Sequence, residues 1–335
     1  MNTRWRVPPV LAPSAIVGEG SSVNESLEQL LSDNLQASHK ITELVTSIER
    51  LAKNDASRAF ATANRWLCHR TAVAVANGRP RTGVKGLAPP SRPFSAAVIW
   101  ANDVADAPIS AQLVKENNEI RIRGILALAD IGTVTFAGRA LAAGPIPWAT
   151  FISSSDTGSF HDRRVIKTIG LSSVPICEID WTGDALACEW FGMQLNNTQL
   201  DRIATERALM HTALLIGTAG AMFDYSLRYA HSRVTFGKRI IQHQAIALKI
   251  ADLHLAIEAG RLLLADAVKS ISTDCALTAA RGAWRYARKI GLETAVDTVQ
   301  VLGAHGLNCE RPVEKWFRDL QTIRFLCDEP YGFGN

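Results

Sequence analysis

The spacing of hydrophobic positions changes twice along the chain, from a helical period to a strand period and back. From about Ser22 to Ala76 the aliphatic residues recur at steps of three and four, which is typical of amphipathic helices. They include Leu27, Leu30, Leu31, Ile41, Leu44, Val45 and Ile48. Two segments rich in proline and glycine follow, NGRPRTG and LAPPSRP, and they indicate a linker.

The middle of the chain, from about Phe94 to Trp190, has the pattern of a β domain. The segment EIRIRGILALA alternates charged and aliphatic residues at the two-residue period of a strand, and TVTFAGRAL and VPICEIDW are similar. Short β-rich runs separated by glycines predict an antiparallel β domain, either a barrel or a sandwich.

Longer helices are predicted from about Asn196 onward. One helix carries a single apolar stripe, in which Gly260 and Ala267 would let another helix approach closely. The other members of the stripe are Ile246, Ile250, Leu253, Ile257, Leu264 and Val268. A second long helix runs from about Leu277 to Leu302 and ends at a glycine, and Pro312 opens a last one. Two long helices and two flanking ones predict a four-helix bundle.

A chain of 335 residues exceeds the usual size of one compact core, so we expect more than one domain. The three patterns predict an α+β protein with an N-terminal helical domain (1–93), a middle antiparallel β domain (94–192) and a C-terminal four-helix bundle (193–335). The net charge of +4 is too small and too dispersed for a nucleic-acid-binding protein. No apolar run approaches the roughly 18 to 20 residues that cross a bilayer, so no membrane contact is expected.

The six cysteines are scattered without paired spacing, which argues against a disulfide framework and against a zinc site. The first residues, MNTRWRVPPVLAPS, contain three prolines and no long apolar core, and make a poor signal peptide. We therefore expect a cytoplasmic protein without a bound metal.

The segment RYAHSRVTFGKRIIQHQ places Arg233, Phe236 and Gly237 together, with Gln244 two turns later. One interpretation is a helix break with a solvated arginine. The other is an anion site, in which a guanidinium holds phosphate oxygens, a ring stacks on a heterocycle and a glycine admits the ligand to the backbone. A dinucleotide such as FAD offers all three partners.

Two further motifs follow. In QVLGAHG, Gln300 could bond a ligand edge, and Gly303 and Gly306 would allow close approach, although a simple helix C-cap explains the glycines equally well. In PVEKWFRDLQTI, the simplest interpretation is an amphipathic helix with Arg318 and Asp319 on the solvent side.

Taken together, YAHSRVTFGKRIIQHQAIALKIADL and QVLGAHGLNCERPVEKWFRD resemble the C-terminal domain of the acyl-CoA dehydrogenases. The family pattern is Y-A-x-x-R-x-x-F-G-x-x-I-x-x-x-Q, then an alanine-rich helix, Q-x-x-G-x-x-G and P-V-E-x-x-x-R-D. The likeness covers about Tyr229 to Arg324, and a weaker one extends into the β domain. The order of helices, β domain and helices also fits the family, although the N-terminal part is shorter than usual.

This resemblance implies that FAD lies at a subunit interface and that the bundle reaches the cofactor of a neighbouring chain. Arg233 would then meet the pyrophosphate and Phe236 the adenine side, with Gly237 beside them. The two glutamines would meet polar edges of the cofactor, and the two glycines of the second motif would shape the turn; these are Gln244, Gln300, Gly303 and Gly306.

The family reaction needs a carboxylate base that removes the proton α to a thioester. Where many members have a glutamate, this chain has Cys327, and Asp328 and Glu329 are displaced from that position. Other members carry the base one helix earlier, which points to Glu206. The structural alternative for Glu206 is an ion pair with a nearby arginine such as Arg202.

The resemblance also implies a T-E-x-x-x-G-S-D-like loop in the β domain, but the corresponding segment reads ANDVADAPISAQ. Three hypotheses follow. The chain is one subunit of an FAD-dependent acyl-CoA dehydrogenase that acts with a second dehydrogenase-like chain, as in bacterial heterotetramers of the steroid-degrading type. It is a self-sufficient, homo-oligomeric dehydrogenase of acyl-CoA thioesters with Glu206 as base. Or it is a scaffold of the same fold without redox chemistry.

Overall fold

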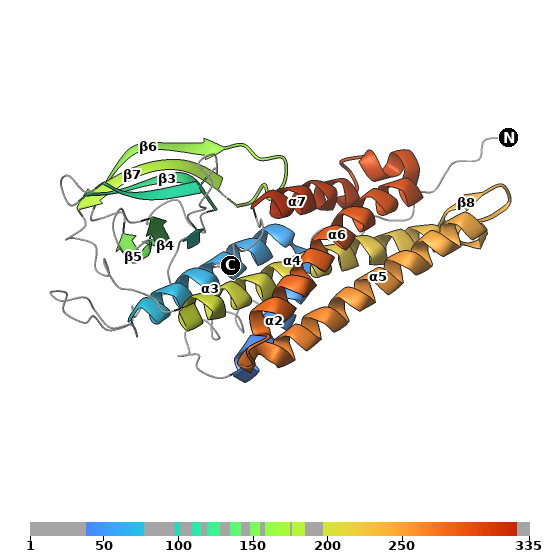
Figure 1. Cartoon of the computed structure of the whole chain (residues 1–335). Coiled ribbons are helices and arrows are strands. Elements are labelled where there is room, and N and C mark those ends of the chain that lie inside the picture. Colours follow the sequence, from blue (N-terminus) through green and yellow to red (C-terminus); the bar gives the residue numbers. More distant parts are fainter. Residues whose placement is uncertain are drawn as a thin grey trace.

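A computed structural model describes residues 38–76, 98–100, 109–114, 119–127, 135–141, 148–154, 158–174, 176–184 and 197–326. The long helices of this part are α2 (Ser38–Asn54), α3 (Ala56–Ala76), α4 (Asn197–Ser232), α5 (Gln244–Lys269), α6 (Ala276–Leu302) and α7 (Pro312–Leu326). A sheet formed by β1 to β7 packs at one end of the helices, and a small hairpin with β8 lies at the other (Figure 1).

The first helical zone is confirmed from Ser38 onward, while Leu27, Leu30 and Leu31 lie outside the described residues. Asp55 separates α2 from α3. Its carboxylate accepts hydrogen bonds from the backbone N–H groups of Ser57, at 3.0 Å, and Arg58, at 3.2 Å. Asp55 is therefore the N-cap of α3.

The sheet contains β1 (Val98–Trp100), β2 (Ile109–Val114), β3 (Glu119–Ala127), β4 (Thr135–Leu141), β5 (Trp148–Ser154), β6 (Gly158–Ile166) and β7 (Ile176–Asp184). The three segments predicted as strands correspond to β3, β4 and β7. The strand order is β1-β4-β2-β3-β7-β6, and β5 pairs with β4.

The prediction of a purely antiparallel sheet is wrong for β4. This strand pairs in parallel with β1 and, at Gln112 and Leu141, with β2. The pairs β2–β3, β3–β7, β6–β7 and β4–β5 are antiparallel as expected. Parallel neighbours need a crossover connection rather than a hairpin, so the alternation within one strand could not indicate them.

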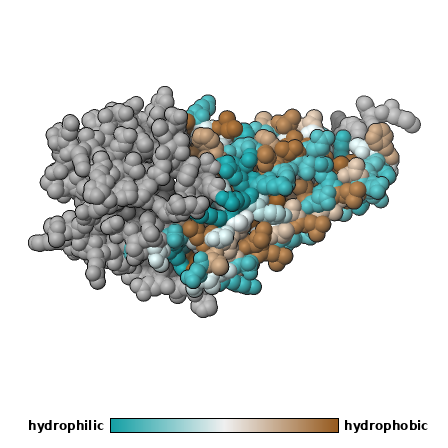
Figure 2. Space-filling model, viewed as in Figure 1, coloured by the Kyte–Doolittle hydropathy of each residue, from teal (hydrophilic) through white to brown (hydrophobic). Residues whose placement is uncertain are grey.

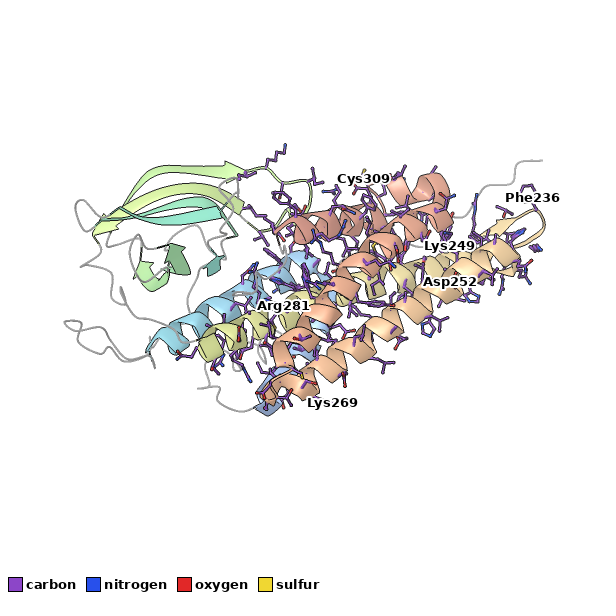
Figure 3. The ribbon with its side chains drawn as sticks, viewed as in Figure 1. Phe236, Lys249, Asp252, Lys269, Arg281 and Cys309 are labelled. Atoms are coloured by element: carbon purple, nitrogen blue, oxygen red, sulfur yellow. The ribbon has the colours of Figure 1, made fainter. Side chains whose placement is uncertain are left out.

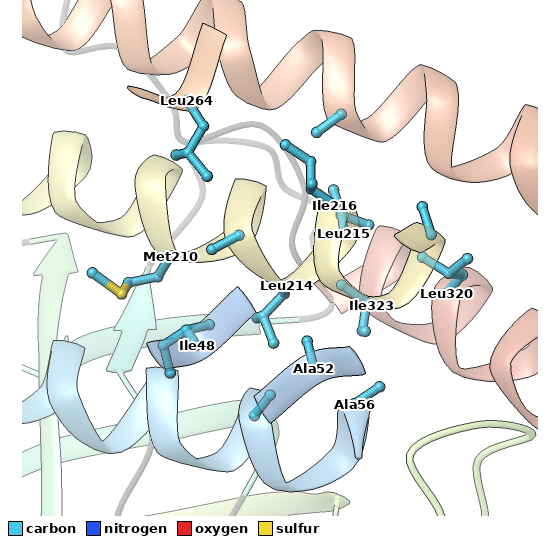
Figure 4. Packing of buried hydrophobic residues seen from close by; sticks show 14 of the residues in the cluster. Ile48, Ala52, Ala56, Met210, Leu214, Leu215, Ile216, Leu264, Leu320 and Ile323 are labelled. Atoms are coloured by element: carbon cyan, nitrogen blue, oxygen red, sulfur yellow. The ribbon is translucent and has the colours of Figure 1, made fainter. Parts of the chain in front are cut away.

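The main core lies where α4 meets α2, α5, α6 and α7. Figure 4 shows Ile48 of α2, Leu214 and Ile216 of α4 and Leu320 of α7 pointing into one apolar cluster, and all are fully buried. Full burial of such side chains contributes about 1.5–3 kcal/mol each.

Glycines set how closely the helices approach in this core. A Cβ added at Gly217 would lie 2.3 Å from the carbonyl oxygen of Glu49, so α2 rests directly on α4. A Cβ at Gly260 would lie 3.1 Å from Ile290 of α6 and 3.2 Å from Ile216 of α4. The close approach predicted at Gly260 is therefore confirmed.

The loop between β6 and β7 docks on α7 through side chains of that helix. Asp319 accepts a hydrogen bond from the N–H of Leu171 at 2.6 Å, and Thr322 accepts one from Gly170 at 3.1 Å. Asp319 is 0% exposed, so its expected place on the solvent side of the helix is wrong. The buried loop, which lies 148 residues earlier, covers this face of α7.

No helix among the described residues combines the length and the apolar character that a membrane crossing requires. The same residues contain no cluster of histidine, cysteine, aspartate or glutamate that could hold a metal ion. Hydrophobic and hydrophilic residues are interspersed along the face of the bundle drawn in Figure 2. The expected cytoplasmic location stays a prediction.

Candidate functional site

The segment around Arg233 forms a tight hairpin that follows the end of α4. The N–H of Arg233 makes the last helical hydrogen bond, to the carbonyl of Tyr229 at 2.9 Å. The strands β8 (Val234–Thr235) and β9 (Lys238–Arg239) then pair in antiparallel. The N–H of Ile240 returns to the carbonyl of Arg233 at 2.9 Å and closes the hairpin. The helix therefore ends in an ordered, hydrogen-bonded hairpin rather than in an irregular loop.

Phe236 and Gly237 form the turn of this hairpin. Both have positive φ, 50° and 78°, as the two central residues of a type I′ turn require. Glycine and asparagine adopt this conformation easily, whereas a phenylalanine there is strained. The side chain of Phe236 is nevertheless 96% exposed, and Figure 3 places it at the extreme end of the bundle. Its ring meets the ring of His243 edge to face, with centroids 6.4 Å apart, and is otherwise open to solvent.

The two candidate glutamines lie at the same end as the hairpin. Gln244 is the first residue of α5, and Gln300 lies in the last turn of α6; both are exposed. An ion pair between Lys249 and Asp297 joins these two helix ends. Because α5 and α6 meet here, the second motif lies beside the first.

The two glycines of the second motif have different roles. Gly303 is exposed, has φ 60° and ψ −139°, and no atom lies within 4 Å of the place where a Cβ would stand. This conformation strongly favours glycine and leaves open space beside the backbone. Gly306 is buried, and a Cβ there would lie 2.9 Å from Cα of Val299. Gly306 therefore serves the packing of the turn against α6.

The charge of the hairpin segment is one-sided. Between Asp224 and Asp252 the chain has five lysines and arginines and no carboxylate. Arg233 is half-buried at the base of the hairpin, while Lys238 and Arg239 are exposed. Cations that gather with a ring and with accessible backbone form a donor set that fits an anionic dinucleotide.

Glu206 lies elsewhere on α4, buried between two arginines. Its Oε2 accepts a hydrogen bond from Arg70 Nε and its Oε1 from Arg70 Nη2, both at 2.9 Å, and Arg202 Nε also donates to Oε1 at 2.9 Å. Burial lowers the pKa of Arg70, but the charge and the hydrogen bonds of Glu206 outweigh it and raise that pKa overall. The ion pair with Arg202, the structural alternative for Glu206, is present.

Glu206 and the hairpin are far apart within one chain. They are separated by 26 residues of the uninterrupted helix α4, from 206 to 232, or about 39 Å at 1.5 Å per residue. Arg202 also donates to the carbonyl of Ile271 at 2.9 Å, beyond the far end of α5. A single ligand cannot contact Glu206 and Phe236 of the same chain.

Several polar residues near these sites were not indicated by the sequence. Arg70 pairs with a carboxylate 136 residues away, which no local pattern can reveal. Arg311 contacts Tyr225 and Tyr229, close to the hairpin. His211 is 3% exposed, and its Nδ1 has no hydrogen-bond partner.

Other candidate residues lie outside the described residues. They are Cys327, Asp328 and Glu329 near the end of the chain, and the first part of the segment ANDVADAPISAQ in the β domain. The predicted domain boundaries at 93 and 192 also fall in such segments. All of these stay predictions.

Comparison with known proteins identifies related sequences. A family model of the C-terminal domain of acyl-CoA dehydrogenases matches residues 197–326. An acyl-CoA dehydrogenase of Bacillus subtilis is 33% identical over 201 residues, which cover 57% of this chain and 51% of that protein. The subunit CarC of the caffeyl-CoA reductase–Etf complex of Acetobacterium woodii is 38% identical over 109 residues, covering 32% of this chain and 29% of CarC. The matches thus span about half or less of these relatives.

Solved structures share the fold over nearly the whole chain. Butyryl-CoA dehydrogenase from Megasphaera elsdenii has a TM-score of 0.66 at 16% identity, covering 97% of both chains. The ChsE4–ChsE5 complex from Mycobacterium tuberculosis has a TM-score of 0.62 at 17% identity, covering 96% of this chain and 95% of the matched one. At such low identity these likenesses establish the fold alone.

Proposed function

We propose that the chain, whose residues 197–326 match the family model of the C-terminal domain of acyl-CoA dehydrogenases, is a subunit of an FAD-dependent enzyme that desaturates an acyl-CoA thioester between its α and β carbons. We propose further that it supplies half of an FAD site to a partner chain. The observation that carries this proposal is the hairpin end, where Arg233, Phe236, Gln244 and Gln300 lie at one end of the bundle. When bound, FAD supplies the hydride acceptor for the desaturation.

The residues of this end fit the cofactor chemically. Arg233 would hold the pyrophosphate through charge-assisted hydrogen bonds, and the ring of Phe236 would stack on the adenine. Gln244 and Gln300 would bond polar edges. The open space beside Gly237 and Gly303 leaves their backbone accessible to a ligand.

An outward orientation supports a site that is shared between chains. Phe236 is almost fully exposed in a strained turn although its ring meets His243 edge to face, and a molecule that covers the ring would account for this exposed aromatic residue. The outer face of α5 also exposes Leu248, Leu255 and Leu262, by 57%, 66% and 72%, at seven-residue steps. Exposed apolar residues in such a row are typical of protein contacts. Both features favour an oligomer.

The kind of partner chain is inferred from the state of the candidate base in this chain. Glu206, the described candidate for the base, already binds two guanidinium groups, and accepting a proton would break both ion pairs. A chain that offers a dinucleotide-binding end, and whose described candidate base is already paired with two arginines, would act with a second, more complete dehydrogenase-like chain. The ChsE4–ChsE5 structure contains two different named components, which is consistent with a hetero-oligomer as our preferred form. The steroid-degrading type is what the sequence resemblance implies.

A self-sufficient homo-oligomeric dehydrogenase is the second candidate. The observation in its favour is that Glu206 is a fully buried carboxylate, because a base for a weakly acidic α proton works best away from water. Its two arginine partners count against it. A scaffold without redox chemistry is the third candidate, and it predicts no flavin in any preparation.

Co-expression with an adjacent gene for an acyl-CoA dehydrogenase-like protein tests the proposal. Flavin per chain would be measured by absorbance and mass by light scattering, for the unmodified chain, Arg233→Gln and a control. Lys269→Gln is the matched control, because Lys269 is an exposed cation at the opposite end of α5 from the hairpin (Figure 3).

One FAD per pair of unlike chains, lost in Arg233→Gln and kept in Lys269→Gln, is the expected result. One FAD per chain in a homo-oligomer would favour the second candidate. Absence of flavin with every partner would favour the scaffold. Flavin that is retained equally in both variants would contradict the role of the hairpin.

A further inference from the structure

Three chain segments meet around Tyr229, directly below the hairpin. Tyr229 lies in the last turn of α4, and its carbonyl accepts the hydrogen bonds of Arg233 N–H at 2.9 Å and Ser232 Oγ at 3.0 Å. Its ring lies 6.1 Å from the ring of His305, in the turn η6 (Gly303–Leu307). The guanidinium of Arg311, just before α7, lies 5.6 Å from the same ring. Tyr229 therefore contacts the base of the hairpin, the turn η6 and the residue that precedes α7.

Arg311 is held in place by a second tyrosine of α4. Its Nη1 donates a hydrogen bond to the hydroxyl of Tyr225 at 3.0 Å. Tyr225 precedes Tyr229 by one helical turn, so both rings lie on one face of α4. Tyr225 also meets the ring of Trp316 edge to face, with centroids 6.1 Å apart. Arg311 therefore joins the start of α7 to two successive turns of α4.

The planar guanidinium can make both contacts at once. It offers five N–H donors in one plane and a flat face that is attracted to an aromatic ring. A lysine at this position would keep the charge, but as a compact ammonium it cannot reproduce this fork geometry. The identity of the residue, and not only its charge, thus matters at position 311.

We propose that Arg311 is a positioning residue for the dinucleotide-binding end. The inference rests on the proposed function, since the ligand is the FAD considered above. Arg311 follows the turn that carries Gly303, and it contacts the helix from which the hairpin with Arg233 and Phe236 emerges. It therefore holds the two motifs at a fixed separation, so that both face one ligand.

The test compares Arg311→Met, Arg311→Lys and a matched control. Arg324→Met removes a guanidinium from the other end of α7, where Arg324 contacts Gln321 and not the tyrosines. The rate of tryptic cleavage at Lys238 and Arg239 reports the order of the hairpin without any cofactor. The FAD retained by the complex and the thermal midpoint would be measured in parallel.

We expect Arg311→Met to accelerate cleavage in the hairpin. FAD binding should weaken about tenfold, because the variant loses the cation–ring contact with Tyr229 that positions the hairpin for the ligand. Its thermal midpoint should fall no further than that of Arg324→Met, and Arg311→Lys should recover only part of both effects. Cleavage rates that are equal in Arg311→Met and Arg324→Met would overturn the proposal.

The two proposals fail in different ways. If FAD is lost in Arg233→Gln but retained in Arg311→Met, the positioning role alone is overturned. If FAD is retained in both variants while Arg311→Met still loosens the hairpin, the proposed FAD site is overturned and Arg311 orders the hairpin for another purpose.

Discussion

The carboxylate of Asp319 accepts the backbone N–H of Leu171 at 2.6 Å and so ties α7 to the loop between β6 and β7. Its other oxygen accepts Lys315 Nζ at 2.6 Å. Leu171 is fully buried and has φ 55°, a conformation that is unfavourable for leucine. The hydrogen bond to Asp319 offsets this strain.

Asp319→Ala should lower the free energy of unfolding by about 2–3 kcal/mol, because it leaves a buried N–H without an acceptor. Asp319→Asn keeps an acceptor and should cost less. Urea unfolding of both variants measures the difference. Lys315→Met serves as the control, since Lys315 is 40% exposed and its removal should have a small effect. Equal losses for Ala and Asn would contradict the role of the hydrogen bond.

Glu206→Gln should lower the free energy of unfolding by about 3 kcal/mol, since it removes the buried carboxylate with which the partly buried Arg70 and Arg202 pair. The matched control is Glu258→Gln on α5, because Glu258 also pairs with an arginine but is 44% exposed. That change should cost less than about 1 kcal/mol. Thermal or urea unfolding compares them. A stable Glu206→Gln that abolishes turnover would instead restore Glu206 as the base.

His211 should make the protein sensitive to mild acid. Burial, and then the positive charge of Arg207, lower the pKa of His211 well below 6.5, and its side chain is held neutral in the fold. Below about pH 6.5 the unfolded chain binds the proton and the folded chain does not, so stability falls as pH falls. Above that pH the group contributes no dependence. The slope is at most about 1.4 kcal/mol per pH unit for this one proton.

Unfolding midpoints between pH 8 and 5 measure this effect. His211→Gln should flatten the profile below pH 6.5, whatever it does to absolute stability. His231→Gln is the control, because it replaces a histidine that is exposed at the end of α4 rather than buried. Parallel profiles for the unmodified chain and His211→Gln would contradict the prediction.

Two glycines should respond oppositely to a methyl group. Gly282 lies on the exposed side of α6, and no atom lies within 4 Å of the place where its Cβ would stand, so Gly282→Ala should stabilise the chain by about 1 kcal/mol. Gly170→Ala would place a Cβ 2.3 Å from the carbonyl oxygen of Arg318 and should destabilise by about 1–3 kcal/mol or more. Urea unfolding of the two variants measures whether the free energy of unfolding changes in opposite directions. A stabilising Gly170→Ala would contradict the described contact with α7.

The sequence predicted the helices well because their length and apolar periodicity are local properties. The stripe with Gly260 on α5 and the end of α6 at Gly303 agree with the structure. The features that it missed depend on distant segments. The parallel partners of β4, the burial of Asp319 and the pairing of Arg70 with Glu206 arise only when the chain is folded.

The candidate site was predictable in composition but not in form. The motif identified Arg233 and Phe236 as neighbours, and the structure adds that they belong to a hairpin with a strained, exposed turn. No sequence pattern indicates the positive φ of Phe236, apart from the glycine that follows it. The identification of Glu206 as a base stays a prediction, and its arginine contacts now weigh against it.

The unbroken course of α4 limits which insertions and deletions this protein can accept during evolution. One residue added to a helix turns everything beyond it by about 100° and advances it by about 1.5 Å. Between the ion pairs of Glu206 and the base of the hairpin there is no loop that could absorb such a change. A single-codon insertion or deletion there would move Arg233 to another side of the bundle. The length of this segment should therefore be far more constrained than the identities of its residues.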